Sequence, residues 1–180
     1  EPQEGSILID GIDISQIDPA DLRKKISYVP QDIHLFRNTI KNNILGSYKF
    51  VDDEWMIKCS KISGTDEFVK LHPVGYDMPI GERGAGLSGG QRQSVGIARA
   101  LINDSKIYLF DEPTNAMDQT SESNVLNNLK ENLEEKTLFL VTQKMNMLDL
   151  VTRVIVMNQG EKVLDGDKME IIKKLGVNNG

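Results

Sequence analysis

The sequence has only one cysteine and no long apolar segment. With Cys59 alone, the 180-residue chain has no partner for an internal disulfide, which is typical of proteins from a reducing compartment. We assign no function to this thiol. The longest apolar runs, such as 107–110 and 138–141, have four residues, whereas a membrane-spanning helix needs about 20. We therefore expect no membrane span, and residues 1–5 lack the regions of a signal peptide.

An excess of positive charge is also missing. The formal net charge is -6, and the Lys and Arg residues are scattered among acidic ones. Because a nucleic-acid-binding surface needs a basic stripe to neutralise phosphates, the sequence predicts no nucleic-acid partner. Apolar residues make up 39% of the chain and charged residues 27%, close to globular averages. The length then predicts one compact domain.

The first half of the sequence predicts strands followed by a helical layer. Alternating apolar residues in 5–11 and the β-rich run 26–30 predict two early strands. From about residue 39 to 71 the apolar residues follow helical spacing. Ser88 is placed to cap a further helix, whose apolar side carries Val95, Ala98, Leu101 and Ile102.

The second half predicts a βαβ unit and a hairpin. The apolar run 106–111 ends in a carboxylate, which favours a central parallel strand covered on both faces. A helix over about 121–135 and a buried strand over 137–142 complete the unit. Residues 153–157 and 161–164 flank Asn-Gln-Gly and predict a hairpin. A last helix is expected over about 167–175.

The motif LSGGQRQ begins at Leu87. Two glycines behind a capping serine allow a ligand to approach the backbone, and a helix N-terminus attracts an anion such as phosphate. For the glycine pair alone, the alternative is a turn that merely starts a helix. The whole motif resembles the signature of ABC ATPases. That resemblance implies that Ser88, Gly89, Gly90 and Gln91 contact the γ-phosphate of ATP held by the opposite subunit.

The residues that follow the apolar run 107–110 resemble a Walker B motif. Adjacent residues at a strand end point in different directions, so Asp111 can reach Mg²⁺ while Glu112 polarises the attacking water. The alternative is a strand end capped by solvated acids. Residues 115–118, NAMD, resemble the D-loop, usually Ser-Ala-Leu-Asp, although the first and third residues differ. The resemblance implies that Asp118 links the sites of two subunits.

Two further segments resemble loops of the same family. VPQD, residues 29–32, resembles the Q-loop, whose amide, here Gln31, can coordinate Mg²⁺ or bridge to the attacking water. An ordinary polar strand cap is the alternative. GERG, residues 81–84, resembles the loop that exporters place against the transmembrane coupling helices of the partner. Glu82 and Arg83 are then candidate coupling residues, with solvated surface charge as the alternative.

Gln143 occupies the position of the family's switch histidine, since neither His34 nor His72 is placed for that role. A glutamine can donate and accept hydrogen bonds and can therefore orient a water, but it cannot become a cation. We predict a working but altered switch. The alternative is a polar residue at a strand end with no catalytic part.

Together the motifs predict an ABC transporter nucleotide-binding domain. The P-loop pattern G-x-x-x-x-G-K-[ST] is absent from residues 1–180, and the family carries it shortly before the segment that matches 1–5. We therefore expect an N-terminally truncated, partial domain. Segments 68–77 and 141–148 look most like type I secretion exporters of Gram-negative bacteria.

The resemblance implies an α/β fold, a RecA-like P-loop NTPase core with a mostly parallel sheet and an inserted helical subdomain. We expect residues 36–99 to form that subdomain, with 1–35 and 100–180 in the core. ATP and Mg²⁺ are the implied ligands. A transmembrane permease domain, fused or separate, and a homodimer of nucleotide-binding domains are the implied partners, at the cytoplasmic face of the bacterial inner membrane.

Two alternatives remain at this point. The chain could be a non-catalytic fragment that docks to a permease or caps the ATP of a partner. It could also be a soluble ABC ATPase of DNA repair or translation, which the exporter-like residues 81–84 and the lack of long coiled-coil heptads disfavour.

Overall fold

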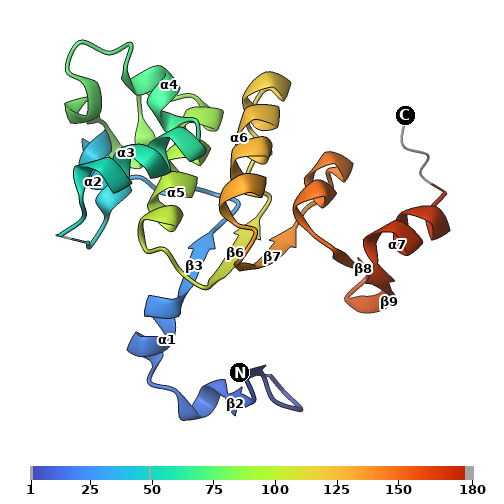
Figure 1. The fold of residues 1–180 in the computed structure, drawn as a ribbon. Helices are drawn as coiled ribbons and strands as arrows, with labels where there is room; N and C mark the ends of the chain where they lie inside the picture. Colours follow the sequence, from blue (N-terminus) through green and yellow to red (C-terminus); the bar gives the residue numbers. More distant parts are fainter. Residues whose placement is uncertain (1, 49, 177–180) are drawn as a thin grey trace.

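A three-stranded parallel sheet organises the fold (Figure 1). The computed structural model describes residues 2–48 and 50–176. Strand order is β3-β6-β7, with bounds Ile26–Val29, Ile107–Asp111 and Thr137–Val141. Helix α6, Gln119–Asn132, connects the parallel pair β6 and β7. The predicted α/β fold with a βαβ unit is confirmed, and β6 is the central strand.

Helices cover one face of this sheet. Figure 1 shows the helices between residues 40 and 132 on one side of the strands, with α5 and α6 next to the sheet, whereas α1 and α7 lie elsewhere. The shared core joins Val29, Tyr108 and Phe110 of the sheet to Val95 of α5 and Leu129 of α6, and each is buried. Helices α2, Ile40–Leu45, α3, Asp53–Ile62, and α4, Thr65–Val69, pack against α5, which spans Gly89–Ile102.

Within the described residues, the opposite face of the sheet is exposed on its outer strands and partly buried on β6, so the prediction of a central strand covered on both faces holds only in part. Tyr28 is 57% exposed and Phe139 is 61% exposed, while Leu109 between them is partly buried. β7 is likewise not a buried strand, since Val141 is 62% exposed at this edge of the sheet. The apolar run 107–110 does form a strand, but a run of apolar residues does not determine what covers each face.

Side chains that accept hydrogen bonds mark where the helices begin. Ser88 and Asp118 cap α5 and α6, and Asp18, with Pro19 behind it, caps α1, Pro19–Lys25. Thr39, Asp52 and Asp167 do the same for α2, α3 and α7, Lys168–Lys174. Short 3₁₀ turns fill connections between elements; their bounds are η1 Ile14–Gln16, η2 Gly75–Asp77, η3 Glu82–Gly84 and η4 Met145–Leu150.

Three antiparallel pairs surround the parallel sheet. β8, Arg153–Asn158, and β9, Glu161–Asp167, form the predicted hairpin, against which α7 packs. The strand predicted within residues 5–11 covers only Leu8–Ile9, and a turn with positive φ at Asp10 and Gly11 follows it and leads into β2. The other pairs are β1 Leu8–Ile9 with β2 Ile12–Asp13, and β4 Asn38–Thr39 with β5 Pro79–Ile80.

Arg99 ties the helical layer to the segment that follows β3. Its guanidinium donates to the Asn43 carbonyl at 2.7 Å, to the Asn43 side-chain oxygen at 3.1 Å and to the His34 carbonyl at 3.0 Å. Burial lowers the pKa of Arg99 from its ordinary value. The predicted subdomain boundary at residue 99 falls inside α5, which contacts both the helices and β3, and the division into 36–99 and two core segments stays a prediction.

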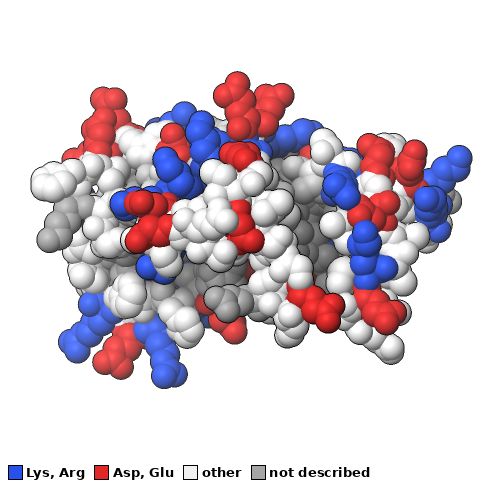
Figure 2. All heavy atoms as spheres, turned by 90° about the horizontal axis from the view of Figure 1, so that it is seen from below, with Lys and Arg blue, Asp and Glu red and all other residues white. Residues whose placement is uncertain are grey.

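The surface carries charges of both signs. On the face drawn in Figure 2, Lys and Arg side chains are interspersed with Asp and Glu. Within residues 2–48 and 50–176 we find no helix with the length and apolar character to cross a bilayer. Cys59 is buried in α3, and this burial raises the pKa of its thiol to about 12.

Close packing of Gly96 generates a stability prediction. A Cβ at Gly96 would lie 2.5 Å from Cδ1 and 2.9 Å from Cγ1 of Ile33. Alanine would gain about 1 kcal/mol of helix propensity, whereas overpacking costs about 1–3 kcal/mol. We expect Gly96→Ala to lower the free energy of unfolding by about 1 kcal/mol, as the difference of these terms, measured by urea denaturation.

Removing Ile33 provides the control for this prediction. In an Ile33→Ala background the crowded atoms are gone, so Gly96→Ala should raise the free energy of unfolding relative to that background. Equal destabilisation by Gly96→Ala in both backgrounds would contradict the packing argument.

Candidate functional site

The carboxyl ends of the parallel strands meet at one edge of the sheet. Asp111 is the last residue of β6, and Glu112 follows it directly. Gln31 lies two residues beyond the end of β3, and Gln143 lies two residues beyond the end of β7. Because β6 is the middle strand, the two carboxylates stand between the loops that carry the two glutamines. The structure therefore brings four predicted site residues to the same edge.

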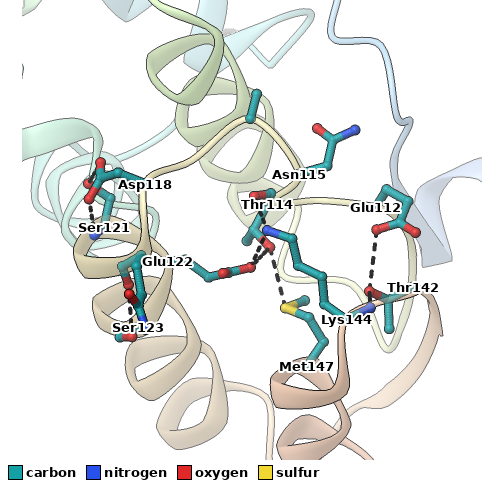
Figure 3. Close-up of polar contacts among 12 residues, drawn as sticks. Glu112, Thr114, Asn115, Asp118, Ser121, Glu122, Ser123, Thr142, Lys144 and Met147 are labelled. Atoms are coloured by element: carbon teal, nitrogen blue, oxygen red, sulfur yellow. Dashed lines mark hydrogen bonds and ion pairs between the residues drawn. The ribbon is translucent and has the colours of Figure 1, made fainter.

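Glu112 is held by the loop that follows β7. Its backbone N–H donates to the Val141 carbonyl at 2.9 Å. Its carboxylate accepts from the Gln143 backbone N–H at 2.8 Å and from the Thr142 hydroxyl at 3.3 Å, the second of which is drawn in Figure 3. The φ of Glu112 is 44°, a left-handed conformation that costs a non-glycine residue energy and is often found at functional sites.

Thr142 is a site residue that the sequence interpretation did not include. Its hydroxyl donates to Glu112 and accepts from the Lys144 backbone N–H at 3.0 Å. The side chain of Gln143 is exposed, and the contact with Glu112 comes from its main chain. A threonine directly before the switch position was the only signal in the sequence for this contact.

Oxygen ligands at the strand ends fit a hard cation. Asp111 is partly buried, and Gln31 is exposed at the neighbouring strand end. Within the described residues, no group of three or more His, Cys, Asp or Glu side chains could by itself hold a metal ion. This set suits Mg²⁺, which commonly binds one or two carboxylates and takes its other ligands from water and substrate phosphates.

The signature segment starts α5 with a capping box. The Ser88 hydroxyl accepts from the Gln91 N–H at 3.1 Å, and the Gln91 side-chain oxygen accepts from the Ser88 N–H at 2.9 Å. The side-chain oxygen of Gln91 is thus used within its own helix. The predicted phosphate contacts of these residues stay predictions.

The two glycines of the signature allow α5 to touch the loop after β6. A Cβ on Gly89 would lie 2.9 Å from the Ala116 Cβ. A Cβ on Gly90 would lie 3.1 Å from the Ala116 carbonyl oxygen and 3.2 Å from the Met117 Cα. Glycine at these positions therefore serves packing within the chain, in addition to the ligand approach that the sequence suggested.

Gln93 is a second residue whose role the sequence did not reveal. It is 4% exposed, and its side-chain oxygen accepts from the Ala116 N–H at 2.9 Å. Its amide group donates to the Asn115 side chain and, at 3.3 Å, to the Glu112 carbonyl. Its only sequence signal is a polar residue among the buried positions of α5. The amide fixes the signature helix against the turn that carries Glu112.

Asp118 begins α6 as its N-cap. Its carboxylate accepts from the Thr120 and Ser121 backbone N–H groups at 3.1 and 3.0 Å and from the Ser121 hydroxyl at 2.6 Å (Figure 3). The Ser121 hydroxyl and backbone bonds hold the pKa of Asp118 below its ordinary value. The predicted link between subunits stays a prediction for this residue. Glu82 and Arg83 are exposed, and φ of Arg83 is 54°.

A groove separates the start of α5 from α4 and α6. Its volume is about 350 Å³. Ser88, Gly90 and Gln91 line one side, and Asp118 and Ser121 line another. The signature and the D-loop of one chain therefore face the same space.

Comparisons with known proteins agree with these motifs. The sequence model described as "ABC transporter" matches residues 1–115. The leukotoxin export ATP-binding protein LtxB of Aggregatibacter actinomycetemcomitans is 37% identical over 172 residues, which cover 96% of this chain and 24% of that protein. The leukotoxin translocation ATP-binding protein LktB of Mannheimia haemolytica is 39% identical over 172 residues, again 96% of this chain and 24% of that protein.

A solved structure of a bacterial Atm1-family ABC exporter with ATP bound has a similar fold. The TM-score is 0.91 at 32% sequence identity, over 97% of this chain and 31% of that one. This chain spans about a quarter of the length of the curated relatives that it matches. The family match, the identities to the relatives and the shared fold agree: the chain belongs to the ABC transporter family.

Proposed function

We propose that this chain is part of the ATP-binding and ATP-hydrolysing domain of an ABC exporter. The observation that carries the proposal is Glu112, whose carboxylate stands at the central strand end and accepts the Gln143 N–H at 2.8 Å. A carboxylate held beside a second one, at the edge where parallel strands end, can accept a proton from an attacking water. Hydrolysis of a nucleoside triphosphate is the reaction that this arrangement suits best.

The residues at the strand ends have different roles in this proposal. Glu112 polarises the attacking water, and the Gln143 side chain, which is exposed beside it, orients that water as a donor and acceptor. Asp111 and the amide oxygen of Gln31 would hold Mg²⁺. When bound, this ion neutralises charge on the phosphate oxygens.

The signature residues serve the site of a second subunit. Ser88, Gly89, Gly90 and Gln91 present the N-terminus of α5, where free N–H groups and the helix dipole favour the γ-phosphate of ATP. Asp118 faces the same groove and links the two sites. The functional unit is then a homodimer of nucleotide-binding domains.

The transport function follows from the relatives. Their names describe ATP-binding proteins of leukotoxin export and translocation. We therefore assign this chain to protein export by type I secretion, with a transmembrane permease domain, fused or separate, as partner. Glu82 and Arg83 are exposed coupling candidates on the helical segment 36–99. This assembly would lie at the cytoplasmic face of the bacterial inner membrane.

A second candidate function applies to residues 1–180 by themselves. They contain no P-loop pattern, and therefore no backbone cradle for the phosphates. Alone, these residues would dock to a permease or cap the ATP of a partner with the signature.

The lack of a P-loop within residues 1–180 predicts weak nucleotide binding by this chain. The signature supplies only one side of a site whose other side is a P-loop. Isothermal titration calorimetry with Mg-ATP should show a dissociation constant much weaker than about 1 μM. Binding at or below that value, or phosphate release by the purified 180-residue chain, would contradict the division of the site between two subunits.

Glu112→Gln should abolish most turnover once a P-loop-bearing ATPase segment is joined before Glu1. Losing a general base costs about 10²-fold or more in kcat. The neutral amide of Gln also removes a negative charge near the phosphates of ATP, and therefore reduces the repulsion that opposes closure of the dimer around ATP. An ATP-bound dimer should then accumulate on size-exclusion chromatography.

Two further variants frame this result. Glu135→Gln, an exposed glutamate beyond α6, should leave kcat unchanged. Ser88→Arg should block closure sterically and prevent the dimer from forming. Full activity of either the Glu112→Gln or the Ser88→Arg homodimer would exclude the assigned roles.

Gln143→Ala tests the side chain at the switch position in the same P-loop-bearing protein. Alanine keeps the main-chain N–H that binds Glu112, so only the exposed amide is lost. We expect kcat to fall by at least about tenfold, or about 1.4 kcal/mol, with little change in ATP affinity. Steady-state kinetics beside Gln143→His checks it, and an unchanged kcat in the alanine variant would remove the side chain from the mechanism.

A further inference from the structure

An ion pair between a partly buried lysine, Lys144, and a buried glutamate, Glu122, links the loop after β7 to α6. Glu122, in the first turn of α6, is 6% exposed and accepts from the Lys144 ammonium at 2.7 Å. The Thr114 hydroxyl donates to the same carboxylate oxygen at 2.5 Å. The Met147 sulfur lies 3.4 Å from this hydroxyl and is also buried. Figure 3 shows Lys144 reaching from its loop toward both Thr114 and Glu122.

Lys144 joins the loops that follow two neighbouring strands. Its ammonium donates a second hydrogen bond, at 2.9 Å, to the carbonyl of Thr114. Thr114 lies two residues after Glu112, and Lys144 lies one residue after Gln143. One side chain thus fixes the turn beyond β6 relative to the turn beyond β7.

The opposite side of the same loop holds the Glu112 carboxylate. The Lys144 backbone N–H donates to the Thr142 hydroxyl at 3.0 Å, and that hydroxyl donates to Glu112. The Gln143 N–H binds the other carboxylate oxygen at 2.8 Å. The two donors to Glu112 therefore belong to the residues directly before Lys144, and any shift of the loop would move them.

Hydrogen bonds favour the charged form of the Glu122 carboxylate although this side chain is buried. Burial acts to raise the pKa of Glu122, but hydrogen bonds from Lys144, Thr114 and Asn146 outweigh it and hold the pKa below its ordinary value. A buried charge that loses its partner is costly. Separation of Lys144 from Glu122 is therefore unfavourable, and the ion pair holds the loop after β7 in place.

We propose that Lys144 is a positioning residue: by binding the Thr114 carbonyl and the Glu122 carboxylate, it holds the Thr142 hydroxyl and the Gln143 N–H against the Glu112 carboxylate. The catalytic consequence rests on the proposed function. The positional part does not, and it can be measured without turnover.

Hydrogen exchange of two amides tests the positional part in the 180-residue chain. The Gln143 N–H binds the Glu112 carboxylate, and the Glu112 N–H binds the Val141 carbonyl close by. In Lys144→Met, we expect protection of the Gln143 amide to fall by about tenfold relative to that of the Glu112 amide. A general loss of stability would lower both protections together, so the ratio isolates the loop.

Two variants serve as matched controls. Lys144→Arg keeps a cation that can donate to both acceptors and should preserve the ratio. Lys136→Met removes a lysine that binds Asp104 at 2.7 Å and joins the loops at the opposite ends of β6 and β7. It should also leave the ratio unchanged.

Removing both charges keeps the test valid if Lys144→Met fails to fold. Lys144→Met combined with Glu122→Gln leaves no unpaired buried charge, and it should fold with the same low ratio. The proposal is overturned if the ratio in the folded variant equals that of the unchanged chain. It is equally overturned if Lys136→Met lowers the ratio as much as Lys144→Met.

Kinetics of the P-loop-bearing protein test the catalytic part. Lys144→Met should lower kcat by about tenfold with KM for ATP unchanged, and Lys144→Arg should restore kcat. If turnover of the unchanged protein proved independent of Glu112, the proposed function would fail while the exchange ratio still decided the position. A Glu112-dependent enzyme whose kcat is insensitive to Lys144→Met would overturn the catalytic part.

Discussion

The close packing of α5 is the constraint on which the rest of the structure depends. This helix is buried along most of its length between the helical layer and the sheet. Gly96 meets Ile33, and Arg99 binds the carbonyls of His34 and Asn43, so the segment after β3 is fixed against the same helix. Since interiors pack at near-crystalline density, α5 cannot move without moving these neighbours.

The start of α5 extends this packing to the candidate site. Gly89 and Gly90 bring the helix N-terminus against Ala116, and the buried amide of Gln93 binds the turn after Glu112. The signature helix and the Walker B turn thus form one packed body within a chain. A ligand that shifts the N-terminus of α5 would also shift the turn that carries Glu112, because the helix and the turn are in contact.

The charged side chains near the strand ends fall into two groups. Asp111 and Glu112 lie at the sheet edge, while the buried Glu122 and the partly buried Lys144 form a separate ion pair. The left-handed backbone of Glu112 adds local strain, which the bonds from the β7 loop offset. The Lys144 ammonium binds the Thr114 carbonyl and Glu122 rather than Asp111 or Glu112.

Local patterns in the sequence determined the elements and the motifs. Helical spacing, capping residues and the apolar run 107–110 depend only on neighbours along the chain, so α5, α6, β6 and the C-terminal hairpin could be predicted. Parallel strand ends then placed Glu112 and Gln143 at one edge. Only the tertiary structure decided that Tyr28 and Phe139 on the outer strands are exposed and that Gln93 and Lys144 fix the loops. Gln93 pairs with Asn115 and Lys144 with Thr114 across 22 and 30 positions of sequence, and no local spacing encodes such pairs, because they form only when separate elements pack together.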